Sequence, residues 1–269
     1  MPKLQGAHVL VTGGSSGIGL ATARLAIERG ARVSLMARRA DVLDEAASSL
    51  RAAGGKVAVV ATDVADAAQV DAAITTLTGA LGLVDIAICS AGQARPGYFE
   101  ELDPDLFRQM MDVNYFGTVN VVRAVVPAMI ERGAGSIVGV SSAAGLVGVF
   151  GYTAYAPTKF AVRGFLESLR GELLPHGIHV GCSFPPDTDT PQLADENRYK
   201  PKETKAISGT IKPLSAERVA KSIVEGIEKE RFAIVPDLST RGLAKLAGLA
   251  PGLVTSVMDR AVRKSRAKA

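Results

Sequence analysis

The chain has 269 residues, of which 47% are hydrophobic and 5% aromatic, so it is long and apolar enough for one large folded domain and too apolar for a disordered protein. The net charge is +4, but residues 241–269 hold seven Lys and Arg against one acid, which leaves the remainder at −2 and argues against a nucleic-acid-binding face across the body. Neither Cys89 and Cys182 nor the three histidines have metal-ligand spacing, so no metal site is expected and both thiols are expected to be buried and free.

The N-terminal residues lead directly into an apolar strand, and no run of about 18 apolar residues occurs. From these two features we expect a cytoplasmic protein without a leader peptide or a transmembrane helix.

Short apolar runs alternate along the chain with longer segments in which apolar residues recur with helical period. The short runs predict strands at residues 7–11, 32–36, 57–61, 84–88, 136–140, 179–184 and 232–235. The longer segments predict helices near residues 18–30, 41–53, 66–80, 104–131, 155–174 and 215–229. This alternation predicts an α/β protein of the Rossmann type, a doubly wound parallel seven-stranded sheet with helices on both faces.

No linker divides residues 1–237, which we expect to form a single catalytic domain. Residues 185–210 are polar and rich in proline, and are expected to be a long loop or lid that carries short helices. Residues 238–269 are expected to be a basic C-terminal appendage, with a helix that begins at Pro251. Its apolar stripe either packs on the body or lies on an anionic membrane, which predicts weak, salt-sensitive vesicle binding that is lost when residues 251–269 are deleted. The stripe consists of Val254, Val257, Met258, Ala261 and Val262.

A glycine-rich sequence follows the first predicted strand and opens the first predicted helix. Glycines at such a place permit a tight turn and a close backbone approach to a pyrophosphate, and the helix offers free N–H groups. The candidate dinucleotide-binding residues here are Gly13, Ser15, Ser16, Gly17, Ile18 and Gly19.

Charged side chains follow the next two predicted strands. Arg38 and Arg39 stand where an acid would bind the ribose 2′-hydroxyl of NAD, and two arginines suit the 2′-phosphate of NADP. Asp63, which precedes Val64, is placed to accept from an adenine amino group or to cap the next helix, for which Asp66 is the alternative cap. These residues indicate NADPH/NADP as the cofactor.

Three residues indicate proton chemistry. Tyr155 and Lys159 are four apart on a predicted helix and share a face, and Ser142 ends the fifth predicted strand. An ammonium beside a phenol is expected to lower its pKa, and the serine hydroxyl is placed to bind a substrate carbonyl.

Together these motifs resemble the short-chain dehydrogenase/reductase family as far as about residue 235. The resemblance implies that Tyr155 is the proton donor, Ser142 the carbonyl anchor, Lys159 the ribose-binding partner and Asn114 the residue that holds a water in the proton relay. It also implies a homodimer or homotetramer built on the long helices that begin near residues 104 and 155. The cofactor contacts that it adds are Ala91, Gly92, Tyr155, Lys159, Pro185, Thr188 and Thr190.

Two sequences depart from the family pattern. Cys89-Ser90-Ala91-Gly92 stands where Asn-Asn-Ala-Gly is usual, and Pro185-Pro186 stands where Pro-Gly is usual. Neither touches the catalytic groups, so we expect local changes of loop geometry only.

A narrower resemblance concerns the segment after the sixth predicted strand. Residues 184–191, 194–198 and 200–204 are similar to the substrate loop of the 3-ketodihydrosphingosine reductases, as are residues 151–155 and 159–164. This resemblance implies NADPH-dependent reduction of 3-ketodihydrosphingosine to sphinganine, a lipid chemistry that would suit peripheral contact with a membrane. The alternatives are another hydrophobic carbonyl (steroid, retinoid or fatty acyl) or, without turnover, an NADP-binding sensor.

Such a substrate has an alkyl tail and an ammonium head. Candidate tail-binding residues are Leu146, Val147, Val149, Phe150 and Leu193. Candidate ammonium-binding residues are Asp187, Asp189, Asp195 and Glu196, although solvation at the surface explains such acids equally well.

Overall fold

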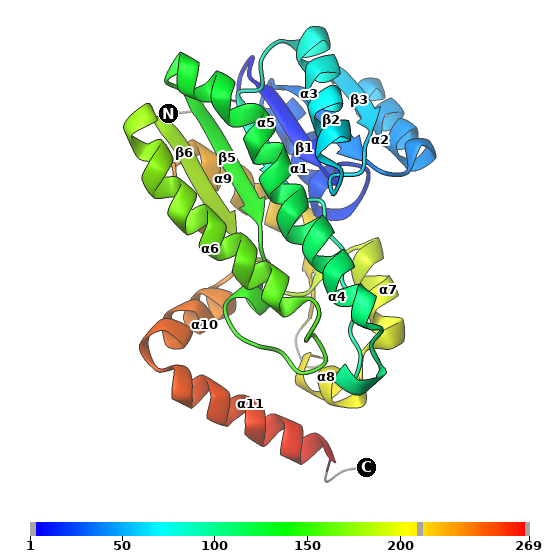
Figure 1. Cartoon of the computed structure of the whole chain (residues 1–269), viewed down its shortest axis with the longest axis vertical. Coiled ribbons are helices and arrows are strands. Elements are labelled where there is room, and N and C mark those ends of the chain that lie inside the picture. The colour runs from blue at the N-terminus through cyan, green and yellow to red at the C-terminus, as the bar shows by residue number, and fades with distance from the viewer. Residues whose placement is uncertain (1–3, 209–211, 267–269) are drawn as a thin grey trace.

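The computed structural model describes residues 4–208 and 212–266, and its centre is a parallel sheet (Figure 1). The 7 strands run in the order β3-β2-β1-β4-β5-β6-β9, with every neighbouring pair parallel. Their bounds are β1 His8–Thr12, β2 Arg32–Ala37, β3 Val57–Ala61, β4 Ile86–Cys89, β5 Gly135–Val140, β6 Ile178–Ser183 and β9 Ala233–Ile234. The predicted Rossmann-type doubly wound sheet is confirmed.

Helices cover both faces of this sheet. One face carries α3 (Ala67–Leu81), α5 (Gly117–Arg132) and α6 (Ala156–Leu173), and the other carries α1 (Gly17–Glu28), α2 (Ala40–Ala52) and α9 (Ala216–Glu228). Each face therefore has its own apolar core, and the five central strands are almost fully buried, as expected for parallel strands, whereas the edge strand β3 is only partly buried.

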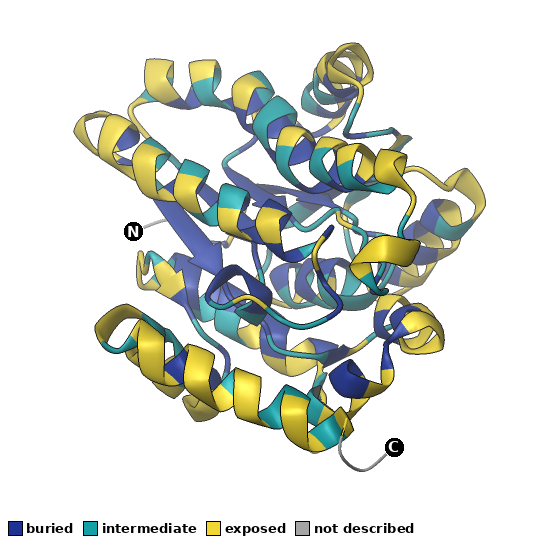
Figure 2. Cartoon of the chain, turned by 60° about the horizontal axis from the view of Figure 1, so that its bottom comes forward, coloured by how far each residue is buried: buried dark blue, intermediate teal, exposed yellow. Residues whose placement is uncertain are grey.

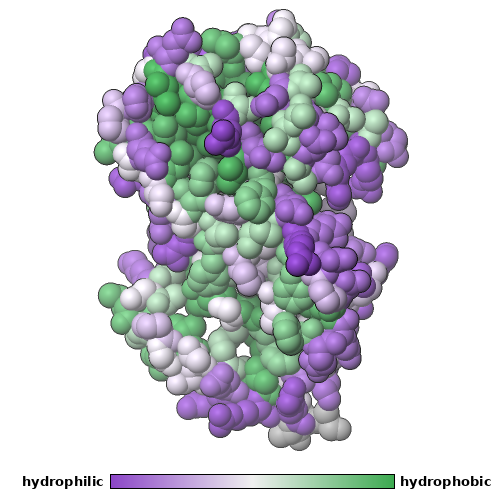
Figure 3. All heavy atoms as spheres, in the orientation of Figure 1, coloured by the Kyte–Doolittle hydropathy of each residue, from purple (hydrophilic) through white to green (hydrophobic). Residues whose placement is uncertain are grey.

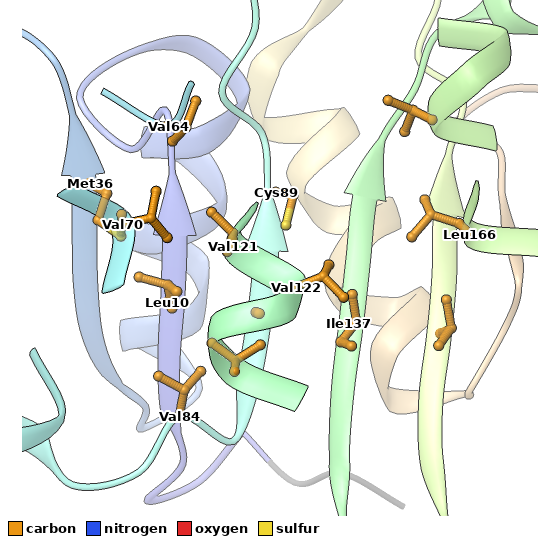
Figure 4. Packing of buried hydrophobic residues seen from close by; sticks show 14 of the residues in the cluster. Leu10, Met36, Val64, Val70, Val84, Cys89, Val121, Val122, Ile137 and Leu166 are labelled. Carbon is orange, nitrogen blue, oxygen red and sulfur yellow. The ribbon is translucent and has the colours of Figure 1, made fainter. Parts of the chain in front are cut away.

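Aliphatic side chains make up these cores. Val121 and Val122 of α5 lie over Leu10, Ile137 and their neighbours on the strands (Figure 4). Cys89 and Cys182 are buried and free, as predicted, and burial raises the pKa of each thiol to about 12.

The helix over residues 104–132 is interrupted in its middle. It consists of α4 (Pro104–Met111), a π-helical turn over Asp112–Phe116, and α5. By length and composition it is the single described helix that could cross a membrane, yet the buried residues of α5 belong to the core above the sheet. We interpret it as a core helix whose π-turn re-aims the side chains around Asn114.

The polar segment after β6 is folded into short elements. A 2-stranded ladder pairs β7 (Thr188–Asp189) with β8 (Leu214–Ser215), and helices α7 (Pro191–Tyr199) and α8 (Lys202–Ser208) lie between them. The sequence predicted short helices here but not the ladder. Strands of two residues are too short to show an alternation of apolar and polar residues.

A helical hairpin follows the sheet. It consists of α10 (Leu238–Leu249), which was not predicted, and α11 (Pro251–Arg266), which begins at the predicted proline. Val254 is buried, and Met258, Ala261 and Val262 are half-buried, so most of the predicted apolar stripe packs inward. Figure 2 shows that the opposite face of α11 is exposed along its length. Residues Thr210 and Lys268, which belong to the predicted loop and tail, lie outside the described residues.

Candidate active site

A cavity of about 760 Å³ opens at the carboxyl ends of the strands. This is the edge where a doubly wound sheet places its ligand crevice. Its walls include every residue predicted above to bind the dinucleotide, together with Ser142, Tyr155 and Lys159. Of the residues predicted to be catalytic or cofactor-binding, Asn114 alone does not line the cavity.

The glycine loop is shaped for close backbone approach. Gly13 and Gly17 have φ angles of +65° and +53°, a region that disfavours other residues. A β-carbon on Gly19 would lie 2.3 Å from the Gly13 carbonyl oxygen, so the loop and the first turn of α1 require glycine there.

The N-terminus of α1 is ready for an anion. Ser16 occupies the cap position with an extended backbone but makes no side-chain cap, and the first turn holds no acid. The free N–H groups and the positive end of the helix dipole therefore remain available at the cavity. The residues present fit the pyrophosphate of a dinucleotide.

The residues that follow β2 and β3 border the same part of the cavity. Arg38 and Arg39 are exposed, and neither pairs with an acid within the described ranges. The Asp63 carboxylate accepts from the Ala65 N–H at 3.0 Å, while Asp66 caps α3 by accepting from the Gln69 N–H at 3.1 Å. Asp63 is thus not the helix cap, and it remains at the cavity wall.

The unusual Cys89-Ser90-Ala91-Gly92 sequence has its own support. The Thr12 hydroxyl oxygen accepts from the N–H groups of Ser90 and Ala91 at 3.2 and 3.1 Å. The Thr12 side chain thus holds this loop against β1. A β-carbon at Gly13 would come within 2.9 Å of Ala91, so a larger residue at position 13 would push the loop away.

The catalytic trio, Ser142, Tyr155 and Lys159, comes together in the wall of the cavity. Lys159 Nζ lies 5.6 Å from the centre of the Tyr155 ring and donates to the Val140 carbonyl at 2.9 Å. Ser142 forms a side-chain hydrogen bond with Tyr155, and its hydroxyl also accepts from the Ala144 N–H at 3.1 Å. The helix and the strand end therefore converge as their spacing predicted.

The electrostatics differ from the sequence expectation. Burial raises the pKa of Tyr155, the charge of Glu196 raises it further, and the hydrogen bond from Ser142 opposes both effects. Burial also lowers the pKa of Lys159 to about 8. The expected depression of the Tyr155 pKa by the ammonium is not seen in this structure, where burial and the charge of Glu196 raise that pKa; the phenol keeps its proton at neutral pH, as a proton donor must.

Asn114 supports the trio from the π-turn. Its amide nitrogen donates to the Gln93 carbonyl at 3.0 Å and to the Thr158 hydroxyl at 2.9 Å, and its amide oxygen accepts from the Gln93 N–H at 2.9 Å. Thr158 directly precedes Lys159, so Asn114 links the loop after β4 to the start of α6. Its predicted water-holding role stays a prediction.

The rest of the cavity wall is largely apolar. Of the predicted tail-binding residues, Val147, Val149 and Leu193 line it, whereas Leu146 belongs to the core and Phe150 packs edge-on against Tyr98. Sequence reasoning missed several wall residues, among them Ile207 of α8, Leu243 of α10 and Met258 of α11. Met258 was assigned to the predicted stripe, but no local signal showed that this stripe faces a cavity.

The comparison with known families agrees with this geometry. The family described as short chain dehydrogenase matches residues 7–201. The chain belongs to the short chain dehydrogenase family. Membership makes it an oxidoreductase that acts on CH–OH and C=O groups, as predicted.

Similar proteins include sphingolipid reductases. The 3-dehydrosphinganine reductase of Danio rerio is 46% identical over 235 residues, 86% of this chain and 71% of that protein. The 3-ketodihydrosphingosine reductase of Mus musculus is 42% identical over 262 residues, 95% of this chain and 78% of that protein. Both predicted resemblances, to the short-chain dehydrogenase/reductase family and to the 3-ketodihydrosphingosine reductases, are confirmed.

A solved structure shares the fold over most of its length. The short chain dehydrogenase/reductase from Burkholderia phymatum, in complex with NAD, is 27% identical with a TM-score of 0.83, over 91% of this chain and 94% of that one.

Replacement of Tyr155 by Phe tests the proton donor. The change removes the phenolic proton but keeps the ring, so ketone turnover should fall by about 10²–10⁴-fold. NADPH should still bind to this variant, as fluorescence titration can measure. A Tyr155→Phe variant that turns over at the wild-type rate would show that another group supplies the proton.

Proposed function

We propose that the chain reduces 3-ketodihydrosphingosine to sphinganine with NADPH. The observation that carries this proposal is the identity of 41–46% to curated reductases of this substrate from fish, mammals and Dictyostelium over most of the chain. The cavity supports it, because a dinucleotide cradle, a proton donor and an apolar chamber are continuous there.

The residues perform three tasks in this reaction. When bound, the reduced nicotinamide supplies the hydride that adds to the ketone carbon. Ser142 holds the carbonyl oxygen, and the Tyr155 hydroxyl delivers its proton to that oxygen as the alcohol forms. Lys159, fixed by the Val140 carbonyl, keeps positive charge beside the phenolate that remains.

A turnover assay tests the substrate. Purified protein with NADPH should convert 3-ketodihydrosphingosine to sphinganine, identified by mass spectrometry. A steroid, a retinoid and a fatty acyl ketone serve as comparison substrates and should have much lower kcat/KM. A higher kcat/KM with one of these would move the chain to that class.

The dinucleotide is NADPH in this proposal because of the charge at the end of β2. Two exposed guanidinium groups without acidic partners among the described residues suit a 2′-phosphate, and no acid stands there to bind a free ribose hydroxyl.

Neutral residues at both positions should reduce this preference. In an Arg38→Ala/Arg39→Ala variant, the Kd for NADPH should rise by about 10–100-fold, because at least one charged hydrogen bond to the 2′-phosphate is lost. The Kd for NADH should change little. Titration with both dinucleotides measures this. An equal loss for NADPH and NADH, or a wild type that prefers NADH, would contradict the assignment.

We further propose a cytoplasmic enzyme that touches anionic membranes through the turn between α10 and α11. Leu249 at this turn is 86% exposed, and Leu253 and Val257 on α11 are 54% and 55% exposed. Basic side chains flank them, and Figure 3 shows hydrophobic residues gathered near this turn above a hydrophilic edge along α11. Exposed leucines beside basic residues are typical of peripheral membrane contact.

Vesicle flotation tests the contact. Wild type should bind phosphatidylserine vesicles at low salt and dissociate as salt rises, because the attraction is electrostatic. A Leu249→Ser/Leu253→Ser variant should lose binding yet keep soluble turnover. Substitution is cleaner than deletion of residues 251–269, which would also remove Met258 from the cavity wall. Binding that the serines leave unchanged would remove this turn from the proposal.

We also propose a homo-oligomer formed through α5 and α6. A phenylalanine is exposed near the N-terminal end of each helix, Phe116 at 47% directly before α5 and Phe160 at 42% in α6. The two helices lie side by side on one face of the sheet (Figure 1), where a second copy would cover both. Light scattering of the purified protein measures its assembly state.

A further inference from the structure

The four acids near the cavity differ sharply in their surroundings. Asp189 and Asp195 are exposed, and Asp195 lies 3.5 Å from Arg198 on the outside of α7. Asp187 forms an ion pair of 2.9 Å with Lys200, whose side chain is 3% exposed. These three acids are thus solvated or already paired with a cation.

Glu196 is different. It is 7% exposed, lies on α7 and lines the cavity. Its two carboxylate oxygens accept from the Tyr152 hydroxyl at 2.8 Å and from the Gln192 amide nitrogen at 2.9 Å. Both donors are neutral, and no cation among the described residues forms an ion pair with Glu196.

Such a carboxylate is prepared for a cationic ligand. Burial raises the pKa of Glu196, and the hydrogen bonds from Gln192 and Tyr152, together with the charge of Lys200, oppose that rise. Each carboxylate oxygen can accept more than one hydrogen bond, so acceptor capacity remains toward the cavity. A cation that enters would offset the cost of a buried charge without a counter-ion.

The position of Glu196 matches the chemistry of the proposed substrate. In 3-ketodihydrosphingosine the ammonium is on the carbon next to the carbonyl, so its partner must adjoin the carbonyl site. The ring centres of Tyr152 and Tyr155 are 5.6 Å apart, and Tyr152 is the residue that donates to Glu196. The carboxylate therefore lies one tyrosine away from the proton donor.

We propose that Glu196 binds the 2-ammonium group of the substrate and makes the enzyme selective for 2-amino ketones over neutral ketones of the same length. This inference rests on the proposed reduction of 3-ketodihydrosphingosine. In this arrangement α7 determines substrate specificity. The alkyl tail of the substrate lies in the apolar part of the cavity, and its ammonium group binds the buried Glu196 carboxylate.

The same charge acts on the proton donor. The Glu196 carboxylate raises the pKa of Tyr155, so it makes the phenol a weaker acid. An ammonium bound between the two cancels that effect as the substrate arrives. A neutral ketone leaves it in place, so discrimination acts on proton transfer as well as on binding.

The test compares two substrates and three variants. The substrates are 3-ketodihydrosphingosine and its des-amino analogue, with hydrogen in place of the amino group. Glu196→Gln keeps the shape and removes the charge; its amide oxygen can still accept from Gln192, and its amide nitrogen can donate to the Tyr152 hydroxyl oxygen, which reverses that bond. Asp195→Asn removes a carboxylate from the adjacent, exposed position. Tyr152→Phe removes a donor to Glu196 and keeps the charge.

The expected result is a loss of selectivity in one variant. In Glu196→Gln, kcat/KM should fall by about 10–100-fold for the amino ketone and stay within about threefold for the analogue. Asp195→Asn should leave both values unchanged, and Tyr152→Phe should retain the preference for the amine. Thermal melting and NADPH titration establish that each variant is folded.

Three outcomes would overturn the inference: equal losses on both substrates in Glu196→Gln, an unchanged amine preference in it, or loss of that preference in Tyr152→Phe. If Glu196→Gln does not fold, the Tyr152→Phe result decides. A wild type that favours the des-amino analogue refutes the proposed substrate itself, whereas a wild type that favours the amine together with an equally selective Glu196→Gln refutes only the role of Glu196.

Discussion

The pairing of β1 between β2 and β4 is the constraint on which the site depends. After β1 the chain builds β2 and β3 on one side, and it then returns to add β4 on the other. The connections that leave β1 and β4 therefore diverge, and a crevice opens where they part. His8 secures this arrangement. Its ring is within hydrogen-bond distance of Ser34 on β2 (2.8 Å) and of the Gly82 carbonyl (2.7 Å), and its backbone N–H donates to the Asp85 carboxylate, just before β4. The glycine loop, Arg38 and Tyr155 all reach one cavity because of this strand order.

The sequence predicted the parts of this molecule that obey periodicity or strict spacing. Seven strands were readable because buried parallel strands are continuous apolar runs, and Tyr155 and Lys159 because four residues make about one helical turn. Contacts between distant segments were not readable. Thr12 as the support of Ser90 and Ala91, and the cavity wall formed by Leu243, depend on tertiary packing that no local pattern records.

The pKa of Tyr155 shows the same limit at the level of energy. Spacing indicated that an ammonium would lie near the phenol, and it does, at 5.6 Å from the ring centre. The sign of the net effect depends on how much water the cavity excludes and on Glu196, which is 41 positions away in sequence. Burial raises the pKa of the phenol and lowers that of the amine, so the phenol stays protonated and the amine loses basicity. A sequence motif can identify which groups lie near each other, but the surrounding fold determines the direction of the resulting pKa shift.

The order of the cavity walls along the chain has an evolutionary consequence. The family match ends at residue 201, and Ile207, Leu243 and Met258 all follow it. The catalytic residues and these three apolar wall residues are therefore encoded in consecutive stretches of the chain and not interleaved. A larger or smaller side chain at one of the three later positions alters the room for an alkyl chain while Ser142, Tyr155 and Lys159 keep their places. Such a layout lets lipid length selectivity drift, or be redesigned, through the last quarter of the sequence without renewed selection on the catalytic centre.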